Sequence, residues 1–362
     1  MNAGDGYRVR ELTNFATLRA FADLFGTDLA HSNHMKHEAV SSIALNVAKE
    51  TGEMNRVGLL TSTYGRDLES CALLCESVDR HVGSFSKHYL LVPDCDLSSF
   101  SHFESERREV IPASTFLPNW LRPLPRLIQR KRRQYWWSFR TWPVSGSQIQ
   151  QYLKIAAVLS LPYERTCILD SDVVFFRDFD LSQFQAPTPI PLFSRPDKVI
   201  SNRPRHWRSL ETSHALLGLP TPPLPAADFI DPIIFRDRQT THAMVSQIEA
   251  VTNLHWIEAL CRTRDFSDTM LYGTFAQNDA RFSGAHRHAS STPCVSTSDR
   301  PKLGKGELNQ LLRSADKDDV AFSVASFPGT PVQTIRAAIE ENEAIQAPRP
   351  VAKETARLDA LC

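Results

Sequence analysis

The sequence predicts an α/β fold: a mainly parallel sheet flanked by helices. Short apolar segments rich in Val, Leu, Ile and Phe alternate with longer segments whose apolar residues recur at helical spacing. Such alternation is typical of parallel strands joined by helices. A pair of aspartates at the end of one apolar segment then indicates a ligand site, because open α/β sheets bind ligands beyond the carboxyl ends of their strands.

Composition limits the classes of protein that fit. The 362 residues include 41 Lys and Arg against 41 Asp and Glu, a formal net charge of +0. This balance argues against a general nucleic-acid-binding protein, which is usually basic. Hydrophobic residues make up 42% of the chain, enough for a sizeable core.

The chain is expected to be cytoplasmic. No run approaches the ~18 apolar residues of a membrane span, and the first residues lack the basic-then-apolar pattern of a signal peptide. The seven cysteines form no Cys-x-x-Cys pair and are typical of reduced, mostly buried thiols.

Three regions are predicted: a helical extension over 1–55, one catalytic domain over 56–340, and a mobile tail over 341–362. In the extension, His31, His34 and His37 recur every third residue. No carboxylate or cysteine cluster accompanies them, which favours a solvated helix face over a metal site.

The first unit of the domain has the layout of a nucleotide site. A strand over 56–61 leads through a turn of small and polar residues into a helix over 67–78. Backbone N–H groups at such a turn and helix start can hold phosphate, although an ordinary strand-to-helix turn has the same layout. The side chains concerned are those of Thr61, Ser62, Thr63, Tyr64, Arg66 and Asp67.

The aspartate pair follows an apolar strand that starts at Cys167. Asp170 and Asp172 are separated by Ser171, and a second short strand begins at Val173. Two carboxylates this close repel each other unless a cation lies between them. A hard ion such as Mg²⁺ or Mn²⁺ suits oxygen ligands and phosphate; the alternative is two solvated aspartates that cap a turn.

Further elements are expected along the chain. The helix expected over 147–160 places Gln150 and Lys154 on one polar face. This face could approach the aspartate strand, or it could simply be exposed to solvent. Ser267 is expected to cap a short helix opened by Asp268. Other expected elements are strands over 87–92, 108–111, 229–235 and 319–324, helices over 240–251, 256–260 and 331–341, and a Pro-rich loop over 187–225.

The segment 117–142 combines seven basic residues with six aromatic ones, and its prolines argue against one continuous helix. Solvated loops rarely carry this much aromatic surface. We expect it to contact an acidic substrate or an anionic membrane surface, which would place the protein peripherally at the inner face of a membrane.

Taken in order, these motifs resemble the GT-A superfamily of nucleotide-sugar glycosyltransferases. They are the turn at 63–67, the stretch Gln150–Lys154, the sequence Leu169-Asp170-Ser171-Asp172, and Phe266-Ser267-Asp268 with Leu271-Tyr272-Gly273. More narrowly, the chain is similar to uncharacterised bacterial proteins of the DUF6492 type. The match covers roughly residues 56–340.

The resemblance implies a Rossmann-like GT-A sheet and a metal-dependent transfer of sugar from a nucleotide sugar to a glycan or glycolipid. It implies that Asp172 binds the metal, with Asp170 beside the ribose or a metal-bound water, and that the turn from Thr61 to Asp67 holds the nucleotide. Lys154 would neutralise the diphosphate and Asp268 would serve as base, although the related pattern has Glu-Tyr where this chain has Asp268-Thr269. His286 or His288 would complete the metal site.

Two other function classes stay open on sequence alone. A domain of this shape can bind a glycan or an anionic surface without turnover. A nucleotidyltransferase also uses paired carboxylates and a divalent ion. Nucleotide-sugar hydrolysis separates a glycosyltransferase from both.

Overall fold

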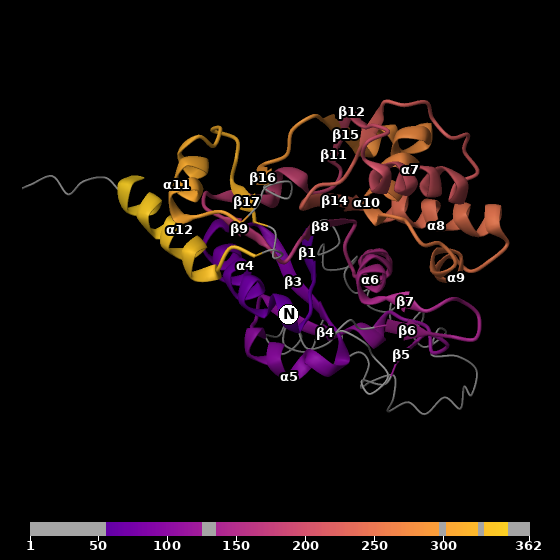
Figure 1. Ribbon diagram of the computed structural model, residues 1–362, viewed down its shortest axis with the longest axis horizontal. Helices are drawn as coiled ribbons and strands as arrows, with labels where there is room; N and C mark the ends of the chain where they lie inside the picture. The colour runs from indigo at the N-terminus through magenta and orange to yellow at the C-terminus, as the bar shows by residue number, and fades with distance from the viewer. Residues whose placement is uncertain (1–55, 125–134, 297–301, 325–328, 347–362) are drawn as a thin grey trace, which may run out of the picture.

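The computed structural model describes residues 56–124, 135–296, 302–324 and 329–346. Its centre is a five-stranded sheet in the order β14-β8-β1-β3-β4 (Figure 1). Strands β8, β1, β3 and β4 are parallel, whereas β14 at the edge runs antiparallel to β8. The bounds are β1 Val57–Ser62, β3 Phe85–Val92, β4 Arg108–Pro112, β8 Arg165–Leu169 and β14 Ile233–Asp237.

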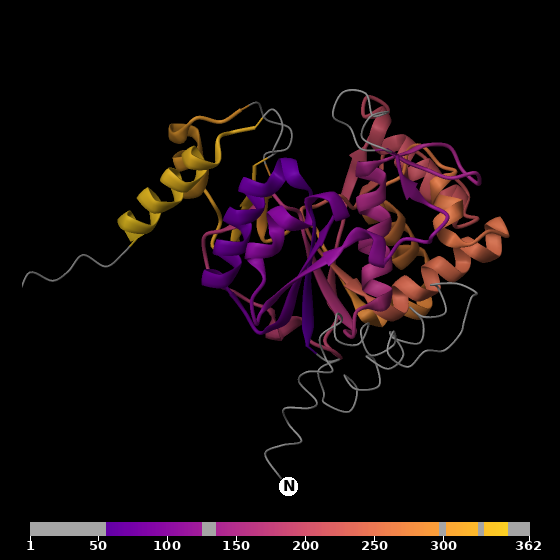
Figure 2. The same ribbon diagram turned by 90° about the horizontal axis from the view of Figure 1, so that it is seen from below.

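Helices cover both faces of this sheet, as Figure 2 shows for α4 and α6 on opposite sides. Successive strand residues point to opposite faces. Leu59 and Cys167 therefore pack with α4 (Leu68–His81), and Leu60 and Ile168 pack with α6 (Gly146–Ser160). The α/β class predicted from alternating segments is confirmed in this mixed form.

Helix α6 starts where the sequence provides a cap. The Ser145 side chain accepts a hydrogen bond from Gln148 N, and the Gln148 side chain bonds back to the Ser145 backbone. Such a capping box satisfies two N–H groups that the first turn leaves without partners. Its stacked apolar residues, Ile149, Leu153 and Ala156 among them, lie on the sheet.

A helical layer lies beyond the β14 edge and joins the same core as α6. It contains α7 (Pro204–Leu216), α8 (Arg238–Thr252), α9 (Trp256–Cys261) and α10 (Asp268–Asn278). Two small sheets accompany it: β11 (Ile190–Phe193) with β15 (His286–Ala289), and β12 (Arg195–Val199) with β13 (Ala226–Asp228). As expected, Ser267 caps α10, because its side chain accepts from Met270 N.

The end of the described chain returns to the aspartate strand. β9 (Val173–Phe175) pairs antiparallel with β17 (Ala321–Ser323), which also pairs with β16 (Cys294–Ser296). Helices α11 (Lys305–Arg313) and α12 (Val332–Gln346) pack together against this sheet and α4. Shorter elements are α5 Leu97–Phe100, β2 Val82–Gly83, β10 Phe179–Asp180, β5 Arg122–Pro123, β6 Tyr135–Trp137 and β7 Val144–Ser145.

Three expectations about elements are wrong. The Pro-rich segment 187–225 is no loop, because it forms β11, β12 and α7, the last with Pro204 in its first turn. Proline fits the first helical turn, where its missing N–H costs nothing. The strand expected over 229–235 begins only at Ile233, because Pro232 lacks the N–H that the ladder needs. Helix α12 continues to Gln346, past the predicted start of the tail.

Several predictions fall outside the described residues: the extension over 1–55 with its histidines, the basic residues of 125–134, and the tail beyond 346. Among the described residues, five cysteines are buried thiols, as expected, namely Cys71, Cys75, Cys167, Cys261 and Cys294, and Cys95 is exposed. No helix in the described ranges is both long and apolar enough to span a bilayer.

Candidate functional site

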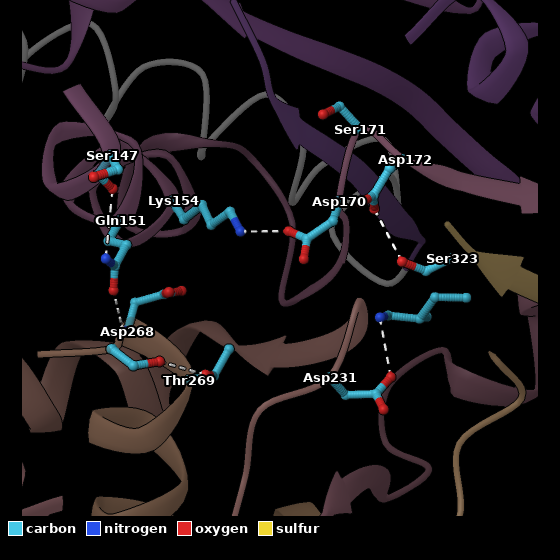
Figure 3. A network of polar contacts seen from close by, with 12 residues as sticks. Ser147, Gln151, Lys154, Asp170, Ser171, Asp172, Asp231, Asp268, Thr269 and Ser323 are labelled. Carbon is cyan, nitrogen blue, oxygen red and sulfur yellow. Dashed lines mark hydrogen bonds and ion pairs between the residues drawn. The ribbon is translucent and has the colours of Figure 1, made fainter. Parts of the chain in front are cut away.

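The carboxyl end of β8 presents the predicted aspartate pair. Asp170 N donates to Pro232 O at 3.0 Å, and Val173 N donates back to Asp170 O at 3.1 Å. These bonds fix a tight turn between β8 and β9 and hold Asp170 and Asp172 in place (Figure 3). The site therefore stands on rigid elements at the edge of the sheet where α/β proteins bind ligands.

Lys154 reaches this turn from α6. Its Nζ lies 2.7 Å from Asp170 Oδ1, and its side chain is 13% exposed against 46% for Asp170 (Figure 3). Burial alone would lower the pKa of Lys154, but negative Asp170 and Asp268 outweigh it and raise that pKa. Lys154 therefore carries a positive charge beside the pair.

Asp172 is held on the opposite side of the turn by the returning strand β17. Ser323 Oγ donates to Asp172 Oδ1 at 3.1 Å, and Val324 N donates to its carbonyl at 3.3 Å. Burial raises the pKa of Asp172 to about 7, with a further contribution from negative Asp170. A cation bound here would stabilise the charged carboxylate and so lower that pKa again.

A third carboxylate, Asp231, lies near the pair in the segment before β14 (Figure 3). Its Oδ1 accepts from Ile233 N at 3.1 Å, and Arg195 Nη2 lies 3.5 Å from its Oδ2. Burial raises the pKa of Asp231 to about 7, and the charge of Asp170 adds to the effect. Asp231 lies within the strand expected over 229–235 and is not among the predicted site residues. The signal that points to it is a carboxylate before proline in an apolar run.

The turn after β1 lies against the pair. Ser171 Oγ donates to buried Asp67 Oδ2 at 3.4 Å, and Asp67 also contributes to the raised pKa of Asp172. The Thr61 hydroxyl lies 3.0 Å from His88 Nε2 inside the sheet, so it is turned away from a ligand.

The other turn residues differ in access. Ser62 and Thr63 are buried, Tyr64 is half-buried and Arg66 is exposed. Burial raises the pKa of the Tyr64 phenol, assisted by negative Asp67. The turn therefore lies next to Asp170 and Asp172. Of its predicted binding residues, only Tyr64 and Arg66 have side chains that solvent can reach.

Asp268 is buried, whereas a catalytic base must reach the hydroxyl group of the acceptor. Its Oδ2 accepts from Arg236 Nη2 at 2.7 Å, and the two side chains are 5% and 0% exposed. Gln151 Oε1 accepts from Asp268 N at 2.9 Å (Figure 3). Because Asp268 also raises the pKa of Lys154, its geometry fits a positioning role rather than the predicted role of base.

His286 is not brought to this site. Its Nε2 lies 2.8 Å from Tyr272 Oη and its Nδ1 lies 3.0 Å from Phe282 O. Tyr272 Oη in turn accepts from Asp237 N, and Asp237 pairs with Arg165 at the amino end of β8. His286 is thus linked to the amino end of β8, whereas Asp172 follows its carboxyl end, and exposed His288 follows on the same strand β15.

The donor set fits a Mg²⁺ or Mn²⁺ ion that is shared with a substrate. Within the described ranges, no three His, Cys, Asp or Glu side chains are grouped to hold a metal by themselves. These ions commonly use one or two carboxylates and fill the remaining positions with water and phosphate oxygens. Asp172 and Asp170 would supply the carboxylates.

A protein-family model for a family of unknown function (DUF6492) matches residues 54–341. The chain belongs to this family. The match includes the turn after β1, the Asp170 turn, Asp231 and Asp268. A search of curated proteins finds no match to the chain.

Proposed function

We propose that this DUF6492 protein is a metal-dependent glycosyltransferase that uses a nucleotide-sugar donor and has a GT-A-type sheet. The observation that carries the proposal is the group of Asp170, Asp172 and Lys154 at the carboxyl end of β8. Carboxylates that hold a divalent cation, next to a lysine, form a site suited to a diphosphate.

The proposed chemistry follows from charge. A nucleoside diphosphate leaves slowly unless positive groups stabilise the negative charge that develops on it. A divalent ion on Asp172 and Asp170 would supply most of that charge when bound. Lys154, which Asp170 holds in place at 2.7 Å, adds a second positive charge without any rearrangement at the moment of reaction.

The turn after β1 is the proposed nucleotide side. It leads through a short 3-10 turn, Gly65–Asp67, into α4, which has no side-chain cap, and a helix amino end favours phosphate. Half-buried Tyr64 and exposed Arg66 lie on this turn and would contact a base or a ribose. Asp67 connects this turn to the aspartate pair through Ser171.

The segment 117–142 is the proposed acceptor side. Phe139 is 96% exposed and Trp142 is 71% exposed, and Arg140 lies between them. Aromatic rings stack on sugars or enter a headgroup layer, and neighbouring cations bind anionic lipids. A glycan or glycolipid at an anionic membrane surface is the acceptor that this chemistry suits.

The deciding experiment is a donor panel. Purified full-length protein with Mn²⁺ is incubated with nucleotide sugars and, separately, with nucleoside triphosphates. A glycosyltransferase releases nucleoside diphosphate from its donor, whereas a nucleotidyltransferase releases pyrophosphate. If neither product forms and no nucleotide binds, a non-catalytic glycan-binding domain replaces the proposal.

A further inference from the structure

Arg195, at the start of β12, brings a second cation to the neighbourhood of the aspartate pair. Its Nη2 lies 3.5 Å from Asp231 Oδ2. Asp231 precedes Pro232, whose carbonyl accepts from Asp170 N at 3.0 Å. Figure 3 shows Asp231 in the same network of polar contacts as Asp170 and Asp172. These contacts join Arg195 to the turn that would hold the ion.

Arg195 is accessible to a ligand. Its side chain is 39% exposed, whereas that of Asp231 is 0% exposed. Among the described residues, Asp231 is its one hydrogen-bond partner. The distance of 3.5 Å is long for a charge-assisted hydrogen bond, which usually measures about 2.7–2.9 Å. A guanidinium has five N–H donors, so most of those of Arg195 are available to a substrate.

The local backbone fixes the plane of this guanidinium. Phe193 and Arg195 are two residues apart in an extended segment, so their side chains lie on the same face. The guanidinium accordingly lies over the Phe193 ring, 4.8 Å from the ring centroid. Ser194 N donates to Ala289 O at 2.9 Å and ties this segment to β15. Stacking uses the face of the guanidinium and leaves its edge for hydrogen bonds, so Arg195 is oriented before a ligand arrives.

The chemistry of this group selects an oxyanion. Arginine binds carboxylate and phosphate through two parallel N–H···O bonds that match its planar fork. A neutral hydroxyl group matches only part of that fork. Because Arg195 is partly exposed, a bound oxyanion would keep part of its hydration, which limits the cost of bringing it near Asp231.

The position of Arg195 selects the part of the substrate. In the proposed reaction the ion and Lys154 bind the diphosphate, and Lys154 reaches Asp170 from α6. Arg195 reaches the same turn from β12, by way of Asp231. The group of the donor that follows the diphosphate is its sugar. A carboxylate on that sugar is therefore the oxyanion that fits this position.

From this arrangement we propose that Arg195 binds the carboxylate of an acidic donor sugar and that Asp231 positions Arg195. The inference rests on the proposed glycosyltransferase function and narrows its donor class. A hydrogen bond to a charged group usually changes a rate or binding constant by about 10–100-fold. We expect a preference of that size for a sugar with a carboxylate over the same sugar with a hydroxymethyl group.

The test uses pairs of nucleotide sugars that share a nucleotide and differ only at C6 of the sugar, a carboxylate against a hydroxymethyl group. Both the gluco and the galacto configurations are included. Donor hydrolysis with Mn²⁺ is measured for the wild type, for Arg195→Gln, which removes the charge, and for Arg195→Lys, which keeps the charge but lacks the fork. Calorimetry with nucleoside diphosphate and Mn²⁺ checks that the diphosphate still binds.

The matched control is Arg208→Gln on α7. Arg208 is 57% exposed and lies 3.4 Å from one aspartate, Asp265, so its setting resembles that of Arg195. Circular dichroism checks that each variant folds, and the comparison of donors with the wild type depends on no variant.

The inference is supported if the wild type and Arg208→Gln prefer the carboxylate donor and Arg195→Gln loses that preference. Arg195→Gln should show a higher KM for the carboxylate donor, yet still cleave the hydroxymethyl donor and bind nucleoside diphosphate. Arg195→Lys should keep part of the preference, because it keeps the charge.

Other results overturn the inference and leave the glycosyltransferase function standing. One is a neutral sugar as the best donor of the wild type, and another is a carboxylate preference that survives in Arg195→Gln. Equal loss on both donors also overturns it and, with weaker binding of nucleoside diphosphate, assigns Arg195 to the leaving group. If no donor is cleaved or bound, the proposed function fails and the inference fails with it.

Discussion

Lys154 and Asp170 come from a helix and a strand that are adjacent in sequence, and their side chains meet at 2.7 Å where α6 crosses the end of β8. The lysine is mostly buried, so its position is fixed before any substrate arrives. In the proposed reaction Lys154 binds the leaving diphosphate, and Asp170 both positions Lys154 and, with Asp172, holds the ion.

Replacing Lys154 by Met should lower donor hydrolysis by about 10²–10³-fold, the usual loss when one preorganised electrostatic donor is removed. The methionine keeps most of the volume, so the fold should survive. Steady-state kinetics check the loss, and Lys305→Met, which removes an exposed lysine on α11, serves as control. Unchanged kcat/KM in Lys154→Met would remove the lysine from the mechanism.

Asp172→Asn should abolish the Mn²⁺ dependence of nucleoside diphosphate binding while the chain stays folded. The amide oxygen can still accept from Ser323, but it lacks the negative charge that holds the ion. Calorimetry with and without Mn²⁺ measures the effect. Asp178→Asn is the control, because that side chain is 93% exposed; equal metal dependence in both variants would contradict the site.

Asp231 should make the metal-free protein less stable as the pH rises. Its folded pKa of about 7 lies above the ordinary value of 3.8, so the folded state binds the proton more tightly. The resulting stability is lost as the pH rises from about 4 to about 7, by up to roughly 4 kcal/mol. Urea unfolding across this range should give a flatter curve for Asp231→Asn than for the wild type; parallel curves would refute the shifted pKa.

Asp268→Ala should destabilise the fold by about 3–5 kcal/mol, because it leaves the charge of Arg236 buried without a partner. The double variant Arg236→Met with Asp268→Leu should recover most of that loss in denaturant unfolding. The role of base predicted from sequence would instead be supported if Asp268→Ala were as stable as the wild type, with a lower turnover number and an unchanged affinity for the donor.

Phe139→Ser combined with Trp142→Ser should reduce flotation with anionic liposomes but spare hydrolysis of the donor alone. Binding should also weaken at 1 M salt, where the Debye length is about 3 Å. Val251→Ser, another exposed apolar position, provides the control. Flotation that is unchanged in the double variant would show that these aromatic residues do not contact the membrane.

The sequence predicted well what depends on local pattern. β1, β3, β4, β8, α4, α6 and the Ser267 cap all follow from alternation, helical spacing and capping chemistry. It also placed Asp170 and Asp172 at a strand end. It could not reveal Ser323 or Arg195 at the site, because these residues arrive through contacts between distant segments.

Two predicted site residues have partners in the structure that the sequence does not show. Asp268 carries a carboxylate in a suggestive motif, but only the packing of α10 on β14 shows that Arg236 holds it. His286 was chosen by residue type alone, and its ring is instead bound by Tyr272 and a backbone carbonyl. The type of a side chain indicates that it could bind a metal. The arrangement of the strands determines at which end of the sheet that side chain lies.

The pairing of β17 with β9 has a consequence for synthesis of the chain. Ser323 contacts Asp172 across 151 positions, so the ribosome has made nearly the whole domain before this partner emerges. Domains generally fold as units during synthesis. A nascent chain halted before β17 would carry both aspartates yet lack the strand that orients one of them, so donor turnover should begin only after β17 has been made.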